Sequence, residues 1–237
     1  MTVDPHYALL EKFPEYQACS AGNISGCYLL QFGDCANDNP RVAIPACTRQ
    51  LAMQDNRKSG VNLRFERAVR YLLRATAYTY QGDLDRALSD YDRAVTADGR
   101  TFWIHAVRGD AYFLAGIYDE ALESYNRALA LEEDEASARN NRVLVLAAAP
   151  DEALHNAPQA LEDALRVNEL VPNQPAYVDA LAIAYAANGD FDMAAEEEER
   201  AIDLLPREDQ ALRDSYRERL RLFRNNVAYV MPANAEG

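Results

Sequence analysis

Residues that interrupt regular secondary structure are scarce in this sequence. Only 10 glycines and 10 prolines occur among 237 residues, which is too few for a loop-rich β protein. No apolar run in the sequence approaches the roughly 20 residues that a membrane-spanning helix needs. Apolar residues still make up 49% of the chain and charged residues 26%, a globular rather than a disordered composition. We therefore expect a helical globular protein that does not insert into a membrane.

Positive charge is also in short supply. Lysine and arginine total 24 against 38 aspartates and glutamates, which gives a formal net charge of −14. Proteins hold a phosphate backbone with clustered lysine and arginine, so a chain this acidic would be repelled unless one face were strongly basic. The composition argues against a nucleic-acid-binding protein.

Recognisable catalytic motifs are missing. No G-x-S-x-G, H-E-x-x-H or glycine-rich phosphate loop occurs. The string GNISG (22–26) is not a nucleophile elbow, because Ser25 stands one place late and no strand precedes it. The chain has three histidines: His6, His105 and His155. We interpret His105 as a packing residue, and we expect no enzymatic activity and no cofactor.

The acidic run EEEER (196–200) resembles a cation site only in composition. Consecutive helical residues point in directions about 100° apart, so these carboxylates do not converge on one ion. We expect a solvated helix face on which Glu196 pairs with Arg200, and no metal site.

All four cysteines lie in the first fifth of the chain: Cys19, Cys27, Cys35 and Cys47. Their even number and close spacing favour disulfides, and pairing Cys19 with Cys27 and Cys35 with Cys47 closes the shortest loops. Reduced thiols and a zinc site are the alternatives, although no C-x-x-C spacing occurs. Disulfides would indicate an oxidising compartment.

The first residues, MTVDPHYALLEKFPEY, have no basic segment followed by an apolar one, as a secretory signal would. Two expectations follow. Either the protein is cytoplasmic, or a signal has been removed from the sequence and the protein is periplasmic or secreted.

One stretch of the sequence recurs. YTYQGDLDRALSDYDRAV (78–95) is followed by YFLAGIYDEALESYNRAL (112–129), and the two align at one constant interval. The aligned pairs are Gly82 with Gly116, Ala87 with Ala121, Tyr91 with Tyr125 and Ala94 with Ala128. A constant period of this length is typical of stacked supersecondary units that bury their apolar faces on one another. Small and aromatic residues three to four apart on both sides of a glycine predict two antiparallel helices joined by a tight turn.

The turn residues fit this prediction. Gly82, Gly116 and Gly189 each follow a helix-compatible run and can adopt the left-handed conformation that ends a helix. Asp83 and Asp190 come next and can cap the helix that follows.

These positions resemble those of the tetratricopeptide repeat family, whose helix pairs of about 34 residues carry small and aromatic residues at fixed positions. Four repeats are expected: repeat 1 at 68–101, repeat 2 at 102–135, repeat 3 at 136–174 and repeat 4 at 175–208. Repeat 3 is longer than the others around Pro150 to Pro158, which we expect to form an exposed loop, and in repeat 4 Glu198 replaces the aromatic residue. The resemblance implies an all-α fold, a right-handed α-solenoid of antiparallel helix pairs.

The flanking segments are interpreted from the same resemblance. Residues 1–38 form a cysteine-containing N-terminal segment, and 39–67 a partial, divergent repeat and linker. Within it, NPRVAIPACTRQL (39–51) resembles the second helix of a repeat, with Cys47 in place of the aromatic residue. The string also resembles segments that open secreted bacterial proteins of this family, which favours the periplasm.

Residues 209–237 are expected to form a capping helix and a tail. An apolar stripe predicts that the helix runs from about 208 to 229: Leu212, Tyr216, Leu220, Phe223 and Val227. A second stripe on this helix is basic: Arg213, Arg217, Arg221 and Arg224. These arginines either pair with acidic neighbours or receive an acidic partner.

The resemblance also implies a ligand groove, lined by positions 2, 5, 9, 12 and 13 of the first helix in each pair. We call these the groove positions: Val69, Leu72, Thr76, Thr79 and Tyr80; Trp103, Ala106, Asp110, Phe113 and Leu114; Ser137, Asn140, Leu144, Ala147 and Ala148; Ala176, Asp179, Ile183, Ala186 and Ala187. Tyr80, Trp103 and Phe113 are the expected aromatic anchors. Leu72 and Thr76 stand where the chaperone-tail subclass carries lysine and asparagine, so that ligand is not expected.

Two functional hypotheses follow. The first is a non-catalytic module that binds a peptide or partner protein in the groove, through Leu72, Thr76, Tyr80, Trp103, Asp110, Phe113 and Asn140. The alternative is an inhibitor or immunity-type protein that binds an enzyme through its acidic outer face or through Arg217 and Arg221. The sequence carries no signal of oligomeric state.

Overall fold

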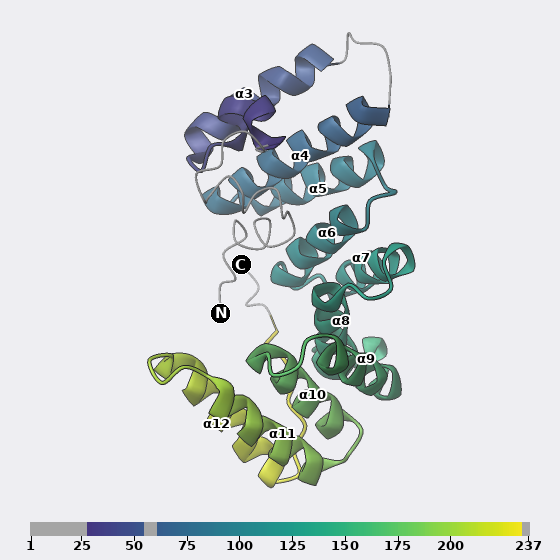
Figure 1. Ribbon diagram of the computed structural model, residues 1–237, viewed down its shortest axis with the longest axis vertical. Coiled ribbons are helices and arrows are strands. Elements are labelled where there is room, and N and C mark those ends of the chain that lie inside the picture. Colours follow the sequence, from purple (N-terminus) through teal and green to yellow (C-terminus); the bar gives the residue numbers. More distant parts are fainter. Residues whose placement is uncertain (1–27, 55–60, 234–237) are drawn as a thin grey trace. The chain divides into compact units, whose positions relative to one another are not determined.

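The computed structural model describes residues 28–54 and 61–233, and within these ranges the regular structure is helical (Figure 1). It divides into two compact units, unit 1 at Met1–Ala111 and unit 2 at Tyr112–Gly237. The helices of unit 1 are η2 (Tyr28–Ala36), α3 (Pro40–Gln54), α4 (Val61–Gln81), α5 (Leu84–Ala97) and the greater part of α6 (Phe102–Leu114). Those of unit 2 are α7 (Tyr118–Leu131), α8 (Ala136–Ala148), η3 (Glu152–Leu154), α9 (Ala157–Leu170), α10 (Pro175–Ala187), α11 (Phe191–Leu204) and α12 (Gln210–Arg224).

Small residues let the helices of a pair approach closely. In unit 1, Ala75 on α4 and Ala87 and Ala94 on α5 are completely buried, and Tyr91 fills the space beside them. A larger side chain at the alanine positions would force the helices apart. The hairpins predicted from the repeat period are therefore present.

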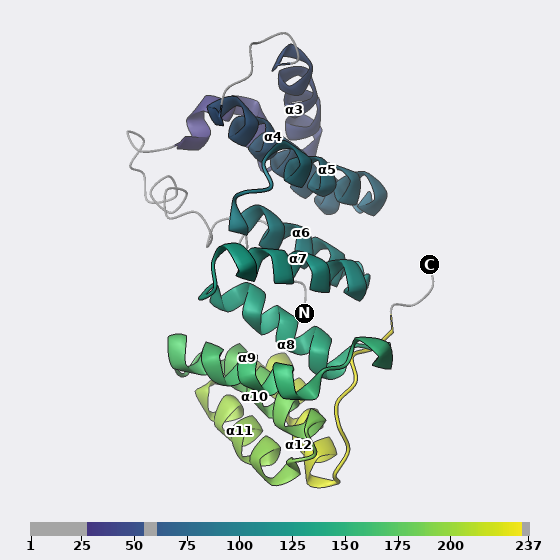
Figure 2. The same cartoon turned by 90° about the vertical axis from the view of Figure 1, so that its right-hand side faces the viewer.

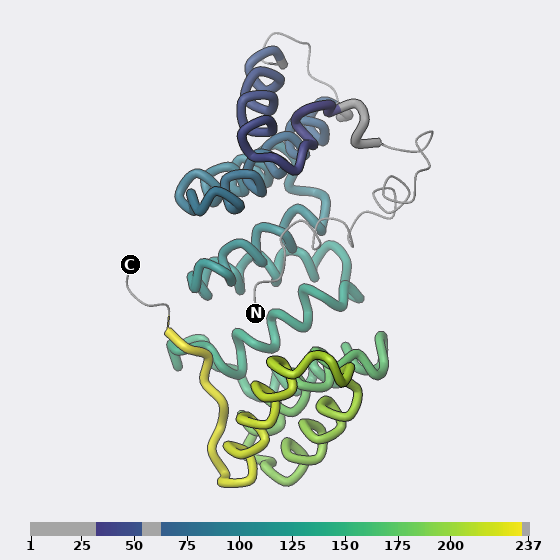
Figure 3. Tube along the Cα trace, turned by 90° about the vertical axis from the view of Figure 1, so that its left-hand side faces the viewer, coloured from purple at the N-terminus to yellow at the C-terminus, as the bar shows by residue number. Residues whose placement is uncertain are grey.

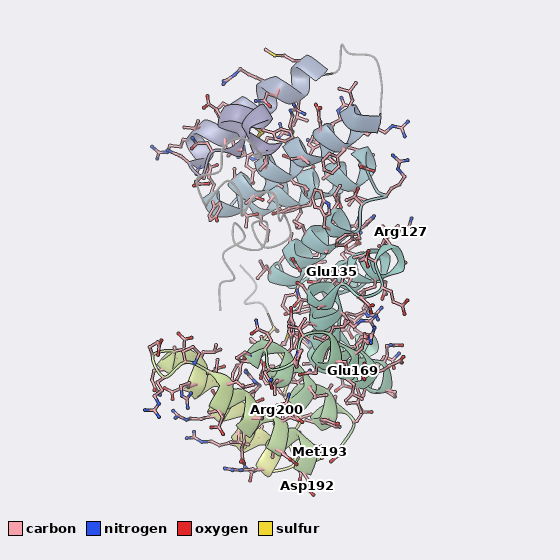
Figure 4. All side chains as sticks on the ribbon, in the orientation of Figure 1. Arg127, Glu135, Glu169, Asp192, Met193 and Arg200 are labelled. Atoms are coloured by element: carbon pink, nitrogen blue, oxygen red, sulfur yellow. A yellow bond between two sulfur atoms is a disulfide. The ribbon has the colours of Figure 1, made fainter. Side chains whose placement is uncertain are left out.

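The turns within the pairs also form as expected. Gly82, Gly116 and Gly189 all have positive φ, at 77°, 70° and 83°. Asp83 caps α5 by accepting a hydrogen bond from the Arg86 amide, and Asp190 caps α11 by accepting one from the amide of Met193, which Figure 4 labels. These caps satisfy amide groups that a helix start leaves open.

A disulfide joins Cys35 in η2 to Cys47 in α3, which confirms one of the two expected bonds. Both cysteines are buried in the core of unit 1 beside Phe32. Cys19 and Cys27 lie outside the described residues.

The third repeat is extended between α8 and α9, where extra residues were expected. The turn η3 forms there, and the Asn156 amide donates to the Leu146 carbonyl at 2.9 Å. The Asn156 side chain accepts from the Gln159 amide and so caps α9. The extra residues thus make an ordered turn with an exposed surface.

The C-terminal helix is shorter than its apolar stripe predicts. It ends at Arg224, where Asn226 takes a positive φ of 56°, and Val227 is 47% exposed. The prediction of a helix to residue 229 is wrong because this left-handed residue ends the helix. Residues 225–233, here called the tail, turn back along unit 2 (Figures 2 and 3).

Candidate partner-binding surfaces

Buried salt bridges hold the first helix of a hairpin against the second. In unit 1 the Arg74 guanidinium on α4 binds Asp90 on α5 through two hydrogen bonds of 2.6 and 2.8 Å. The same guanidinium donates to Thr48 on α3 at 3.0 Å, so that one side chain links three helices. Two-point arginine–carboxylate pairs set orientation as well as distance.

The equivalent contact in unit 2 joins one carboxylate to two arginines. Asp163 on α9 is completely buried and accepts from Arg142 at 2.7 and 2.8 Å and from Arg139 at 2.6 Å, both on α8. Arg74, Arg108 and Arg142 are spaced one repeat period apart, and Arg108 pairs with Asp92 at 3.6 Å. This recurrent arginine was not among the predicted positions, although its period is visible in the sequence.

Repeat 4 has Leu181 at the corresponding position and a different charge cluster. Arg219 of α12 places its Nε atom 2.7 Å from Asp179 Oδ1 on α10 and 3.4 Å from Glu198 Oε1 on α11. The ring of Tyr216 lies 4.5 Å from the guanidinium and that of Tyr229 lies 5.3 Å from it. One arginine thus joins the capping helix, the last repeat and the tail.

Simultaneous ionisation of the two carboxyl groups in this cluster, Asp179 and Glu198, is energetically unfavourable. Burial, and then the charge of Asp179, raises the pKa of Glu198 from 4.5 to about 10. Burial also raises the pKa of Asp179, although the charge of Arg219 opposes that change. The pair therefore shares one proton near neutral pH.

The expectation for the EEEER run is corrected by this cluster. Glu198 is fully buried rather than solvated, because it takes the interior position of an aromatic residue. Arg200 pairs with Glu197 at 2.7 Å rather than with Glu196, and it projects from α11 (Figure 4). Glu196 and Glu199 are exposed, as expected for the rest of the run.

In unit 1, the groove positions are largely interior. Leu72, Thr76 and Trp103 are buried, and the Trp103 ring packs edge-to-face on Phe65 with 5.9 Å between ring centroids. Tyr80, at the C-terminal end of α4, is the exposed aromatic residue of the set, with 43% of its surface accessible. Asp110 is half-buried, and its charge adds to the burial that raises the pKa of Tyr91. Tyr80 is therefore more accessible than Trp103, the other expected aromatic anchor in unit 1.

In unit 2, the first groove residues belong to an apolar patch. Phe113 packs on Tyr118 with 5.5 Å between ring centroids, and Leu114 and Ile117 beside them are exposed. We call Phe113, Leu114, Ile117 and Tyr118 the aromatic patch. Single exposed apolar residues are ordinary, but a contiguous group is typical of a contact surface.

Most groove positions further along unit 2 are small or polar, and Leu144 and Ile183 are the exceptions. Ala147, Ala148, Ile183 and Ala186 are buried on α8 and α10, which pack side by side. Asn140 is also buried: its Nδ2 donates to Asn141 Oδ1 at 3.4 Å, while its own Oδ1 accepts no hydrogen bond from the described residues. Short side chains leave room for a backbone to approach these helices.

The tail makes that approach. The Met231 amide donates a hydrogen bond of 2.8 Å to the carbonyl of Ala148, a groove residue at the end of α8. The Met231 side chain is 8% exposed. Tyr229 reaches Arg219, which also binds the groove residue Asp179. The tail thus bears on the first helices of unit 2.

The basic stripe of α12 is partly engaged within the protein. Arg213 donates to the carbonyls of Ile202 and Leu205 at the end of α11, and Arg224 pairs with Glu199 on α11. Arg217 and Arg221 are exposed, and Arg217 pairs with Asp214 on its own helix at 2.8 Å.

The described histidines bond to backbone. His105 is buried with Nε2 2.9 Å from the Gly99 carbonyl, and Nε2 of His155 lies 2.7 Å from the Ala149 carbonyl. His6 lies outside the described residues. Across the described ranges, no three histidine, cysteine or acidic side chains gather as metal ligands would. None of the helices in those ranges has both the length and the apolarity of a membrane span.

Two models of the same repeat match the chain. One, described as a tetratricopeptide repeat, matches residues 68–101, which is repeat 1 as expected from the sequence. The other, described as a TPR repeat, matches residues 109–148. No curated protein matches the chain at a significant level.

Solved structures show the same fold. A tetratricopeptide repeat protein from Parabacteroides merdae is 18% identical, with 94% of this chain and 74% of that chain covered and a TM-score of 0.64. MamA from Desulfovibrio magneticus RS-1 is 15% identical, with 86% and 96% covered and a TM-score of 0.57. YrrB, described as a TPR protein with an unusual peptide-binding site, is 19% identical, with 87% and 98% covered and a TM-score of 0.56. The repeat period, the helix pairs and these matches agree: the chain carries tetratricopeptide repeats at 68–101 and 109–148 and has an all-α solenoid fold.

Proposed function

We propose that this protein is a non-catalytic interaction module that holds an extended segment of a partner protein against the first helices of its repeats. The observation that carries the proposal is the exposure of Tyr80 and Leu114, two groove residues with 43% and 47% of their surface accessible. Aromatic and large apolar side chains contribute most of the binding energy at protein interfaces. YrrB, which has a similar fold, is described as having a peptide-binding site.

Within each unit, buried ion pairs brace the helices that carry the groove positions. Buried pairs such as Arg74 with Asp90 and Arg142 with Asp163 fix the helices that carry the groove positions. A pre-formed surface loses less conformational entropy on binding than a mobile one. This supports recognition of a flexible segment by a fixed face.

The test compares partner capture by full-length variants. Tyr80→Ala probes unit 1 and Leu114→Ala probes unit 2, while Leu165→Ala removes an equally exposed leucine from the second helix α9 as a control. We expect Tyr80→Ala or Leu114→Ala to weaken the affinity for a captured partner at least tenfold, which equals about 1.4 kcal/mol of binding free energy. Retention of every partner by both variants, or the same loss in Leu165→Ala, contradicts the proposal.

A second candidate function uses α12. Arg217 and Arg221 are exposed in a chain of net charge −14, and the bond from Arg217 to Asp214 is solvent-exposed and therefore weak. This surface supports an inhibitor-like protein that docks onto an acidic enzyme. Here Arg217→Glu/Arg221→Glu should abolish binding, whereas Arg127→Glu, an exposed charge reversal on α7, should not.

A further inference from the structure

The tail alternates between inward and outward side chains. Tyr229 is half-buried, Val230 is 54% exposed and Met231 is 8% exposed. In an extended chain, residues two apart point the same way, so Tyr229 and Met231 share the side that faces unit 2. This is the pattern of an extended peptide laid on a surface.

The surface beneath the tail includes the groove position Ala148 and also Arg219, which binds the groove position Asp179. Met231 bonds to Ala148 on α8, and Tyr229 stacks on Arg219, which is bound to Asp179 on α10. Tyr229 is also near enough to the aromatic patch to add to the raised pKa of Tyr118, after the larger effect of burial. The tail therefore runs from α12 past α10 to the end of α8, as Figures 2 and 3 show.

Few contacts hold the tail in place. Beyond the turn at Asn225–Val227, the one backbone hydrogen bond of the described tail is that from Met231 to Ala148. Val227, Ala228 and Val230 face solvent. A segment held by so few contacts can be displaced without unfolding the helices beneath it.

We propose that the tail is an intramolecular ligand that covers the groove positions of unit 2, and that the partner competes for this place with an extended segment of the same chemistry. The partner segment carries an aromatic residue and, two places later, a long apolar residue, in the roles of Tyr229 and Met231. The aromatic residue stacks on the Arg219 guanidinium and the apolar residue fills the site at Ala148. This inference rests on the proposed function and names the partner's chemistry in unit 2.

The first test is binding in trans. A fluorescent peptide of residues 225–233, NNVAYVMPA, is titrated with the full-length wild type, with Tyr229→Ala/Met231→Ala and with Val230→Ala. We expect the double variant to bind the peptide at least ten times more tightly than the wild type or Val230→Ala. A peptide with both substitutions should not bind. Equal affinities, or no binding by a double variant with native circular dichroism, overturn the proposal.

A second measurement uses the wild type alone and does not depend on the double variant folding. Hydrogen–deuterium exchange of residues 227–233 is followed by mass spectrometry while unlabelled peptide is added in excess. Faster exchange in the tail at unchanged exchange in α8 and α10 supports displacement. Unchanged tail exchange at peptide concentrations up to the millimolar range overturns it.

Failure of the tail proposal can be distinguished from failure of the proposed interaction function. If the tail is a competitor, Tyr229→Ala/Met231→Ala captures the partner more strongly than the wild type does. If capture depends on Tyr80 or Leu114 but is unchanged by the tail substitutions, the interaction function stands and the tail is a structural strap.

Discussion

Arg219 on the capping helix lies 2.7 Å from Asp179 on α10, and both side chains are almost entirely shielded from water. Glu198 completes the group, with its Oε1 atom 3.4 Å from the Nε atom of Arg219. The position of α12 is thus set by a charge cluster as well as by its apolar stripe.

Replacing Arg219 should destabilise unit 2. Arg219→Met leaves two buried carboxyl groups without their counter-charge, and such a loss costs about 3–5 kcal/mol. Urea unfolding followed by circular dichroism measures it. Arg217→Met, which removes an exposed pair, should change the free energy of unfolding by less than about 1 kcal/mol. Equal effects of the two substitutions would show that the cluster has no special role.

The raised pKa of Glu198 predicts a pH dependence of stability. The unfolded chain loses this proton near pH 4.5, whereas the folded protein keeps it up to about pH 10. Between these values the folded state binds more protons, so stability falls as the pH rises, by at most about 1.4 kcal/mol per pH unit.

Glu198→Gln removes this titration while keeping a hydrogen-bond donor for Asp179. The variant should be more stable than the wild type at pH 9, and the difference should shrink towards pH 5. Melting temperatures of both proteins across this range provide the test. A difference that is independent of pH would assign the proton elsewhere.

The main effect of Trp103→Ala should be a loss of folding stability and not the loss of a partner contact. The Trp103 ring is buried against Phe65, and truncation of a buried aromatic side chain costs about 3–5 kcal/mol. Tyr80→Ala should cost less than about 1 kcal/mol, because that ring is exposed. Denaturant unfolding of both variants separates the two roles, and similar losses would contradict the assignment.

The Cys35–Cys47 disulfide should stabilise unit 1. It joins residues at a sequence separation of 12, for which the chain-entropy estimate is about 3 kcal/mol. Trp103 is the only tryptophan and lies in unit 1, so its fluorescence reports the unfolding of that unit. Cys35→Ala/Cys47→Ala should lower the midpoint of this signal. No change in the midpoint would mean that packing alone holds η2 on α3.

The hairpins could be predicted because their determinants are local. Gly82, Ala87 and Tyr91 recur one repeat period later, and each needs only its own helix pair to explain it. The bond from Cys35 to Cys47 could be predicted because this pairing closes a short loop.

The environments of Trp103 and Glu198 could not be predicted, because a distant residue decides each of them. Trp103 is buried because α4 begins at Val61, before repeat 1, and so brings Phe65 over the ring. The burial of Glu198 was not predicted because its counter-charge, Arg219, comes from the next helix. The end of α12 could have been predicted locally. Asn225 and Asn226 are residues that commonly end a helix, but the apolar stripe continues past them and led to the prediction of a longer helix.

The hydrogen bond from Met231 to Ala148 also bears on cooperativity. Repeats in a solenoid normally touch only their neighbours, so their unfolding follows a one-dimensional chain of nearest-neighbour couplings. The tail adds a coupling that skips over the last repeat, from the cap to α8. While the tail is in place, unit 2 is therefore closed into a loop of interactions, and a partner that displaces the tail should open this loop and leave the last helix pair coupled to its neighbour alone.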